Sequence, residues 1–429
     1  MDFITQFENT LEQTLDRGHI AEARQLADAF PNTQQPYTLK LFSLINRLRR
    51  LEQTPHSRFV LFLTGNFILD YILQQFLEYF SEKGFQTCVF DPGNYSKSTN
   101  ELFSFAKDGV DGTFFFNNVG LLQTLQDGRN LWETLEVPCY DFLVDHPMYY
   151  ADSLDEAPSC TTLFCADLTH ADYAKRFYPH VKRTLFFPTG GCTPAASVKP
   201  WNERSMDVLF IGSFKYHSDC INDDFAEAVI SYMQTHTGDT FEQAIACCAQ
   251  NTDSATKVSE EQLKFLTEKY RFLETNVTAL YRKSILASLL DAGITVHVYG
   301  NGWTATGLTE HPQFILHSPV TFEEGLSLMG DTKILLNHMA WFKHGSGERI
   351  FNAMAQGAVC ATDSSRYLDD ILTDRINCLI YRLDDLHVAE QIKTLLSDPE
   401  KASAIIKEGL ITAAAHTWQQ HMESYLFFE

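Results

Sequence analysis

The sequence lacks the features that mark exported or membrane proteins. Its first residues, MDFITQFENTLEQ, contain no basic stretch followed by an apolar run. No later apolar segment approaches the roughly 18 to 20 residues that are needed to cross a bilayer. These absences predict a soluble, cytoplasmic protein with no integral membrane segment.

Closely spaced cysteine pairs and an excess of positive charge are also missing. The ten cysteines are scattered, with Cys160 and Cys165 too far apart for a zinc knuckle and Cys247 directly beside Cys248. We therefore expect buried, reduced thiols and no metal site. The 33 basic residues face 55 acidic ones, and the formal net charge of -22 would repel a phosphodiester backbone. Nucleic acid is not an expected partner.

No Gly-x-Gly-x-x-Gly segment occurs, which argues against an enzyme that uses a nicotinamide or flavin cofactor. What the sequence does contain is enough apolar material for a large core. At 429 residues and 45% hydrophobic content, it favours two domains over one.

Apolar positions at helical spacing predict a helical extension over residues 1–55. Two regions of alternating strands and helices follow. In 56–198 we expect strands at 58–64, 87–90, 112–117, 140–144, 162–165 and 184–187. In 199–410 we expect them at 206–211, 295–300, 314–316, 333–337, 359–362 and 378–381. The fold class is therefore α/β, with two Rossmann-like, doubly wound domains.

Two further features are predicted in the second half. The polar, helical section at about 222–292 exceeds an ordinary crossover, so we expect it to be a helical insertion in the second domain. Residues 411–429 are expected to form a final helix, with a return towards the first domain as an option.

The most informative segment is NHMAWFKHGSGERIFNAMAQG, from Asn337 to Gly357, which is typical of a strand, a glycine-rich loop and a helix. Gly345 and Gly347 would let a ligand approach the backbone, and the first helical amides would face it with unpaired donors. Arg349 in the first turn is unfavourable by about 0.3 to 1 kcal/mol unless an anion lies nearby. The segment thus predicts a pyrophosphate site. In the alternative, Glu348 satisfies the helix start and Arg349 points to solvent.

The helix resembles the Arg-x-Phe-Glu-Ala-x-Ala-x-Gly signature of retaining glycosyltransferases of the GT-B architecture, especially the spore-maturation-type (CgeB-like) group. The matching positions are Arg349, Phe351, Asn352, Ala353, Ala355 and Gly357. The segments Val298-Tyr-Gly-Asn-Gly-Trp303 and Ser318-Pro-Val-Thr-Phe-Glu-Glu324 are similar to those that contact the base and enter the next helix. The likeness extends from about Met206 to Asp385.

This resemblance implies transfer of a sugar from a nucleoside-diphosphate sugar, with a UDP- or GDP-sugar expected, to a glycan or protein acceptor. It also implies retention of configuration, no cofactor and no essential metal, and the absence of an Asp-x-Asp dyad agrees. Many relatives carry Glu, seven residues, then Glu, where this sequence has His344 and Asn352. Asn352 can still bond a ribose diol, and His344 a sugar hydroxyl or a phosphate.

The resemblance and the loop positions give a set of candidate site residues. Expected contacts with the nucleotide-sugar are Gly212, Ser213, Tyr299, Gly300, His344, Gly345, Ser346, Gly347, Glu348 and Asn352. Lys215 and Arg349 are expected to stabilise the departing diphosphate. Asp145 or His146, at the end of a first-domain strand, could act as acceptor base or sugar contact. The alternative for that pair is a turn whose aspartate caps a helix.

Two other functions remain open from the sequence. The missing glutamates favour a binding or scaffolding protein that keeps the fold without catalysis, whereas the glycine-rich loop and Arg349 oppose it. An epimerase acting on a nucleotide-sugar would share the fold, but it needs paired acids that the sequence does not place.

Overall fold

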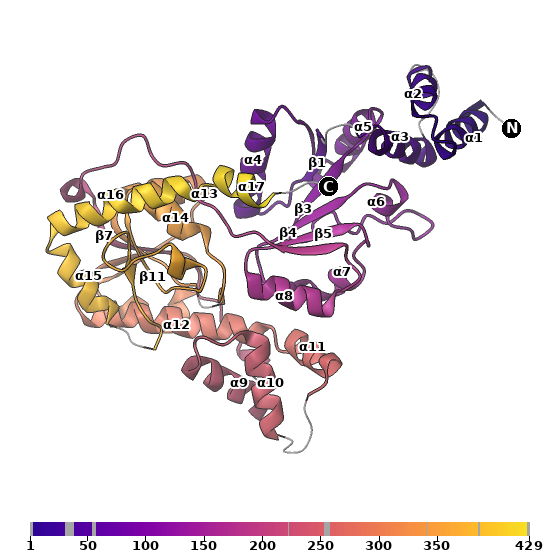
Figure 1. Cartoon of the computed structure of the whole chain (residues 1–429). Helices are drawn as coiled ribbons and strands as arrows, with labels where there is room; N and C mark the ends of the chain where they lie inside the picture. The colour runs from indigo at the N-terminus through magenta and orange to yellow at the C-terminus, as the bar shows by residue number, and fades with distance from the viewer. Residues whose placement is uncertain are drawn as a thin grey trace. The chain divides into compact units, whose positions relative to one another are not determined.

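The computed structural model describes residues 3–30, 38–53, 57–221, 223–252, 258–339, 341–384 and 387–426. The chain divides into two compact units (Figure 1). Among the described residues, unit 1 comprises those up to Cys165 together with Ala171–Leu185. Unit 2 comprises Ala166–His170 and Phe186–Leu426.

Unit 1 begins with three helices, as predicted: α1 (Phe3–Asp16), α2 (Ile20–Asp28) and α3 (Leu39–Leu51). They share an apolar cluster in which Leu11, Leu15 and Leu48 are buried. The side chain of Thr38 accepts a hydrogen bond from the backbone N–H of Leu41 and so caps α3. The apolar stripes of these helices therefore face one another.

A six-stranded sheet follows in unit 1, with the order β2-β1-β3-β4-β5-β6. Its strands are β1 (Arg58–Phe62), β2 (Gln86–Phe90), β3 (Gly112–Phe116), β4 (Cys139–Leu143), β5 (Thr161–Cys165) and β6 (Arg183–Phe186). The pairings from β2 to β5 are parallel. Its helices are α4 (Phe67–Glu82), α5 (Tyr95–Ala106), α6 (Leu131–Thr134), α7 (Ala151–Asp155) and α8 (Leu168–Phe177). Every residue of β1, β3, β4 and β5 is buried, as expected for strands covered on both faces.

Unit 2 contains a second six-stranded parallel sheet, with the order β12-β11-β10-β7-β8-β9. Its strands are β7 (Met206–Ile211), β8 (Val296–Tyr299), β9 (Phe314–His317), β10 (Thr332–Leu336), β11 (Val359–Thr362) and β12 (Leu379–Ile380). Successive strands run from β7 to one edge, and the chain then returns to place β10 on the other side of β7. Doubly wound sheets bind ligands at such a reversal, outside the carboxyl ends of the strands. The predicted strands of both sheets are confirmed.

The predicted helical insertion lies between β7 and β8. It contains α9 (Asp224–Thr235), α10 (Phe241–Thr252) and α11 (Glu260–Lys269), which gather beside the long α12 (Phe272–Asp291) (Figure 1). The remaining helices of unit 2 are α13 (Phe322–Asp331), α14 (Glu348–Ala355), α15 (Val388–Leu396), α16 (Pro399–Ala415) and α17 (Trp418–Tyr425). Within the described ranges, no helix is both long and apolar enough to cross a bilayer.

The end of the chain differs from the sequence prediction of one helix over 411–429. Helix α16 stops at Ala415, and α17 starts at Trp418 with the Thr417 side chain as its cap. Two backbone hydrogen bonds with Gly191 stabilise the break. The Gly191 N–H donates to the carbonyl of His416, and the Trp418 N–H donates to the carbonyl of Gly191. Residues 427–429 lie outside the described residues.

Candidate functional site

Two arginine side chains meet the end of β7, at the point where the strand order of unit 2 reverses. Nη1 of Arg349 donates to the carbonyl of Ile211 at 2.8 Å. Nη1 of Arg282, from α12, donates to the carbonyl of Ser213 at 2.8 Å. The two guanidinium groups therefore bond the two carbonyls that flank Gly212 in the sequence, at the edge of the sheet where doubly wound folds bind their ligands.

This pair of cations has little negative charge to balance it. The nearest carboxylate oxygen to Arg349 is that of Glu348, at 3.9 Å from Nε. Among the described residues Arg282 forms no ion pair, and its buried Nε has no hydrogen-bond partner. Burial, and then the charge of Arg349, lower the pKa of Arg282 to about 9. The guanidinium is thus still charged at neutral pH, and an anion between the two arginines would relieve their repulsion.

Helix α14 begins beside these arginines without a side-chain cap. Its N-cap is Gly347, which has no side chain, and an added Cβ there would meet nothing closer than the Met339 sulfur at 3.8 Å. The first amides of the helix are consequently available to an anion, at the positive end of the helix dipole. The structure places the predicted residues Gly347, Glu348 and Arg349 together at this end.

A buried histidine follows the central strand β10. Both ring nitrogens of His338 are buried and have no hydrogen-bond partner among the described residues. Its Nδ1 lies 3.9 Å from Oδ2 of Asp363, which follows β11. Burial, and then the charges of Arg282, Arg349 and Lys343, lower the pKa of His338 well below its usual value, so the ring is neutral.

Several predicted contact residues of the glycine-rich loop are used inside the protein. Ser346 is fully buried, and its hydroxyl donates to the carbonyl of Thr189. Asn352 is also fully buried, and its Oδ1 accepts from the backbone N–H of Cys192 at 2.8 Å. These arrangements argue against a sugar or ribose contact for Ser346 and Asn352. The sequence could not show that segment 189–192 would cover this face of α14.

The glycine at 345 has a packing role that differs from the predicted one. A Cβ on Gly345 would lie 2.4 Å from the carbonyl of Ala166, and the residue forms a β-bridge with Asp167. The neighbouring His344 N–H donates to the Asp167 carboxylate at 2.7 Å. The loop is therefore fixed by backbone approach to 166–168, whereas a ligand was the predicted reason for Gly345.

The predicted residues after β7 and β8 form one interlocked pair of loops. The N–H of Gly212 donates to the carbonyl of Tyr299 at 2.9 Å, and the hydroxyl of Ser213 accepts from the N–H of Asn301. A Cβ on Gly300 would lie 2.3 Å from the carbonyl oxygen of Gly212. The glycines thus allow the backbones of the two loops to touch. These contacts fix the loops beside Arg282 and Arg349. The Tyr299 ring stacks on His317, with centroids 4.2 Å apart.

Two lysines near the site differ in how much they are engaged. Lys343 donates from Nζ to the carbonyl of Thr237, in the link between α9 and α10, at 2.6 Å. Burial lowers its pKa, against the opposing effect of Glu274 and other carboxylates. Lys343 therefore connects the helical insertion to the glycine-rich loop. Lys215, predicted to contact the diphosphate, is exposed on the loop after β7.

A pocket of about 300 Å³ lies at the carboxyl ends of β11 and β12. Its lining residues come from the insertion link and from the segments after β10, β11 and β12: Thr237, Gly238, Phe342, Lys343, Asp363, Ser364, Ser365, Arg366, Asp369, Tyr381, Arg382, Leu383 and Asp384. Asp363 is buried at its base, and burial raises the pKa of this carboxyl to about 6. Lys343 and Asp363 thus line this pocket, whereas Arg282 and Arg349 do not.

Unit 1 holds the other two predicted residues. The Asp145 carboxylate accepts from Asn117 Nδ2 at 3.1 Å and from the Tyr150 hydroxyl at 2.9 Å. His146 is 5% exposed, and its Nδ1 accepts from the N–H of Met148. The capping side chain of this turn is therefore His146, whereas the alternative from sequence assigned a cap to the aspartate. Its burial argues against His146 as an acceptor base.

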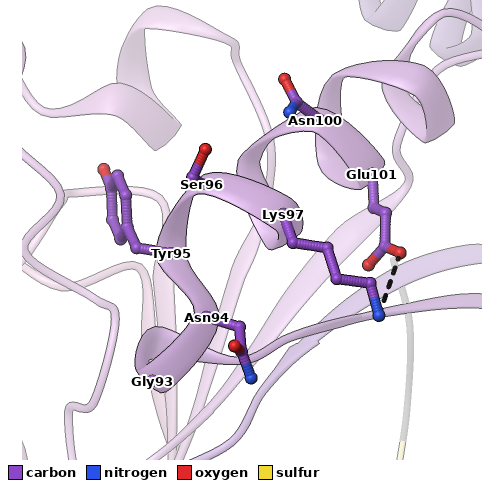
Figure 2. Close-up of a pocket in the computed structure, with 7 residues that line it drawn as sticks. All are labelled: Gly93, Asn94, Tyr95, Ser96, Lys97, Asn100 and Glu101. Atoms are coloured by element: carbon purple, nitrogen blue, oxygen red, sulfur yellow. Dashed lines mark ion pairs between the residues drawn. The ribbon is translucent and has the colours of Figure 1, made fainter.

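Unit 1 also has a broad hollow of about 680 Å³ at the start of α5 (Figure 2). All seven residues that line it are exposed: Gly93, Asn94, Tyr95, Ser96, Lys97, Asn100 and Glu101. Lys97 and Glu101 neutralise each other as a surface ion pair at 3.6 Å. The hollow therefore offers no buried polar group or net charge that would select a ligand.

Sequence reasoning missed Arg282 and His338. Arg282 stands in α12, which carries buried residues on most of its surface, so helical periodicity gave no reason to single it out. The only signal was a pair of cations, Arg282 and Lys283, inside the largely apolar stretch ALYRKSILASLL. His338 directly follows a buried strand, a position that is more often simply part of the core.

The architecture defines a class, the GT-B fold with its two Rossmann-like sheets. Among similar solved structures, a sucrose-phosphate synthase from Thermosynechococcus elongatus has 10% identity and a TM-score of 0.50, covering 86% of this chain and 97% of that chain. Anabaena HepE in complex with UDP-glucose has 9% identity and a TM-score of 0.45, covering 86% of this chain and 99% of that chain. An alpha-glucosyltransferase in complex with UDP and a 13-mer DNA has 11% identity and a TM-score of 0.49, covering 84% and 95%.

The family match covers a smaller part of the chain than the similar structures do, and its description names a type of activity. Residues 282–426 match the family described as Glycosyl transferase-like. No curated protein matches the sequence. The matched region begins at Arg282 and contains His338, the glycine-rich loop and Arg349. The fold and this match together support a glycosyltransferase enzyme.

Proposed function

We propose that the chain transfers a glycosyl group from a nucleoside-diphosphate sugar to an acceptor, and that unit 2 binds the diphosphate. The observation that carries this proposal is the pair Arg282 and Arg349 at the carbonyls that flank Gly212, beside the uncapped start of α14. Among the described residues, Glu348 is the one carboxylate that pairs with either arginine, at 3.9 Å. Charge-assisted hydrogen bonds from guanidinium groups and helix amides are well suited to a diphosphate.

The same groups would serve the chemical step. Negative charge grows on the diphosphate as the bond to the sugar breaks, and fixed cations stabilise that charge without reorganising. Lys215 would add a weaker, solvent-screened contribution, because it is exposed. Retention of configuration and independence from metal follow from the family resemblance and belong to this proposal, as do a UDP- or GDP-sugar donor and a cytoplasmic location.

For the acceptor, a glycan or a protein, we propose contact with Asp145 in unit 1. This carboxylate is partly exposed and is held by Asn117 and Tyr150, so its orientation is defined. A carboxylate in this setting could accept a hydrogen bond from an acceptor hydroxyl.

The first test is a thermal-shift screen against UDP, GDP, ADP, CDP and dTDP without added metal. Binding of one nucleotide should raise the unfolding temperature, because a ligand of the folded state stabilises it. Arg349→Ala should weaken binding of that nucleotide by about 1.5 to 3 kcal/mol, the range for a hydrogen bond to a charged group. Arg375→Ala is the control, since Arg375 is an exposed cation beside Asp374.

The outcomes of this screen separate the two functions that remain. A shift that depends on Arg349 supports the donor site and would direct a search for the sugar by donor hydrolysis. No shift with any nucleotide, in a folded protein, would contradict the proposal. It would favour a protein that keeps the fold for binding or scaffolding.

A further inference from the structure

The buried His338 is not explained by the fold. A buried imidazole normally has at least one hydrogen-bond partner, because an unpaired polar group in the interior loses its hydrogen bonds to water without replacing them. Neither nitrogen of His338 has one among the described residues, although the ring lies within 3.9 Å of the Asp363 carboxylate. The His338 ring is thus buried without the hydrogen bond that normally offsets the loss of contact with water.

The groups that face His338 come from every element packed around it. They are Tyr281 and Arg282 from α12, Arg349 from α14, Lys343 from the glycine-rich loop, Asp363 after β11 and Tyr381 after β12. The Tyr381 hydroxyl, which donates to the carbonyl of Asn337, is neutral because burial raises its pKa well above the usual value. Three cations therefore act on the imidazole, and Asp363 is the carboxylate that lies beside it. Further carboxylates act on the cations themselves: Glu274, Asp167 and Asp239 on Lys343, and Glu348 on Arg349.

A diphosphate bound at Arg282 and Arg349 would change this balance. Two of the three cations that repel a proton from His338 would then be neutralised by the ligand. The remaining carboxylate, Asp363, would attract the proton across 3.9 Å. Burial still opposes a charge on His338, but the repulsion from Arg282 and Arg349 is then offset by the ligand. A protonated ring is therefore less unfavourable in the occupied site than in the empty one.

We propose that His338 takes up one proton from solvent when a nucleoside diphosphate binds between Arg282 and Arg349. The inference rests on the proposed donor site and adds a charge-balancing residue to it. The proton adds to a ring nitrogen lone pair, and no covalent bond breaks. His338 is a positioning residue, because it acts through the electric field of the arginines and the ligand.

A thermodynamic consequence follows. If one proton is taken up, lower pH favours the complex, and affinity changes by up to about tenfold per pH unit over the range where uptake is complete. Release of the diphosphate must return the proton, so higher pH favours release. Proton uptake and ligand affinity are then linked in both directions.

The experiment is titration calorimetry with the nucleotide that gives the largest shift among UDP, GDP, ADP, CDP and dTDP. Repeating each titration in buffers of different ionisation enthalpy gives the number of protons taken up. We compare the wild type with His338→Asn over about pH 6 to 8. The ligand phosphate also takes up protons in this range, but equally with both proteins, so its contribution cancels in the difference. The wild type should take up about one proton more than the variant.

Two further variants sharpen the assignment. His180→Asn removes an exposed histidine from unit 1 and should match the wild type. Asp363→Asn tests the buried carboxylate that lies beside His338. Loss of uptake in Asp363→Asn together with normal uptake in His338→Asn would contradict the proposal and assign the proton to Asp363.

The remaining outcomes are distinct. If His338→Asn does not fold, the nitrogen chemical shifts of isotope-labelled histidine in the wild type replace it, and a ring that stays neutral on nucleotide binding would overturn the proposal. Nucleotide binding with equal proton uptake in the wild type and His338→Asn would overturn this inference alone. Binding by none of the five nucleotides would overturn the donor site as well.

Discussion

Helix α4 of unit 1 and helix α14 of unit 2 begin in opposite ways. In unit 1, the Asp70 carboxylate in the first turn of α4 accepts from the N–H groups of Thr64 and Gly65, and Asn66 caps the helix. In unit 2, α14 has an arginine in its first turn and Gly347 as an N-cap without a side chain. In α4 the Asn66 side chain occupies the first helical amides and the Asp70 carboxylate occupies those of the preceding loop, whereas α14 has no side-chain cap. Side chains, and not topology, therefore decide which unit can hold a diphosphate.

The two units also contain different buried titratable groups. Unit 1 buries an acid, Asp141, in the middle of β4, and burial raises its pKa to about 7. Unit 2 buries bases, among them His338 and His421. Burial lowers the pKa of His421 to about 4, with a smaller opposing effect of its bond to Pro188. Asp141 and His421 are therefore expected to reduce stability at opposite ends of the pH range. Unit 2 also buries an acid, Asp363, whose pKa burial raises to about 6.

The largest effect is expected from Asp141→Asn. The folded pKa of about 7 exceeds the unfolded value of about 3.9, so the folded state binds more protons between these values and stability falls as pH rises. By about pH 8 this amounts to roughly 4 kcal/mol, which the asparagine should remove. The side chain keeps an oxygen for the Asn118 N–H, which Asp141 bonds at 3.1 Å.

The measurement is urea unfolding at two pH values, with pulse hydrogen exchange of β4 peptides to report on unit 1 separately. The gain should be large at about pH 8 and small near pH 3, where Asp141 is mostly protonated in both states. An equal change at both pH values would contradict a protonated Asp141 and would remove this half of the comparison.

The second effect concerns His421 in α17. Its ring bonds His416 at 3.1 Å and the carbonyl of Pro188 at 3.0 Å. The folded pKa of about 4 lies below the unfolded value of about 6.5, so the unfolded state binds more protons and stability falls as pH drops between them. The loss amounts to roughly 3 kcal/mol.

His421→Asn should flatten this acid-side dependence in peptides of unit 2, measured by the same pulse exchange. The variant loses a hydrogen bond at every pH, so the slope with pH is the informative quantity and the absolute stability is not. A slope identical to that of the wild type would assign the acid sensitivity to other groups, His338 and His416 first.

The smallest effect comes from giving α14 a side-chain cap, which α4 has in Asn66. Gly347→Asp places a carboxylate at the N-cap of α14, where φ is -95° and a Cβ has room. It should stabilise the helix by about 1 kcal/mol and weaken nucleotide binding by a similar amount, because it competes for the same amides. Thermal unfolding and calorimetry measure the two effects.

Gly347→Ala is the matched control, since it adds the Cβ without the charge. Binding that is weakened equally by alanine would point to a steric cause. Binding unchanged by aspartate would show that the start of α14 does not face the nucleotide, and the contrast with α4 would lose its functional meaning.

Most of the fold was predictable from the sequence because its signals are local. Strands such as β3 and β7 are largely apolar runs that end at an asparagine or a glycine, and the helices between them have clear periodicity. The break between α16 and α17 was not predicted. It depends on backbone bonds with Gly191, more than two hundred residues earlier in the chain, which no local pattern reveals.

The site was predictable only where a backbone feature marked it. Arg349 and Gly347 stood out because a cation and a glycine are unusual at a helix start. Ser346 and Asn352 share that segment, and only the packing of 189–192 on α14 shows that their polar atoms are used. Arg282 is brought to the end of β7 by a bond to Ser213, 69 positions away in the sequence, so its role depends on tertiary structure alone.

The bond from Lys343 to Thr237 makes the helical insertion hard to remove. Trimming the loop between α9 and α10 to build a smaller protein would leave a largely buried ammonium group without the carbonyl that it bonds at 2.6 Å. That ammonium stands one residue before His344, whose backbone fixes the glycine-rich loop. An evolutionary or engineered deletion there would have to replace Lys343 at the same time, so the insertion and the loop are expected to change together.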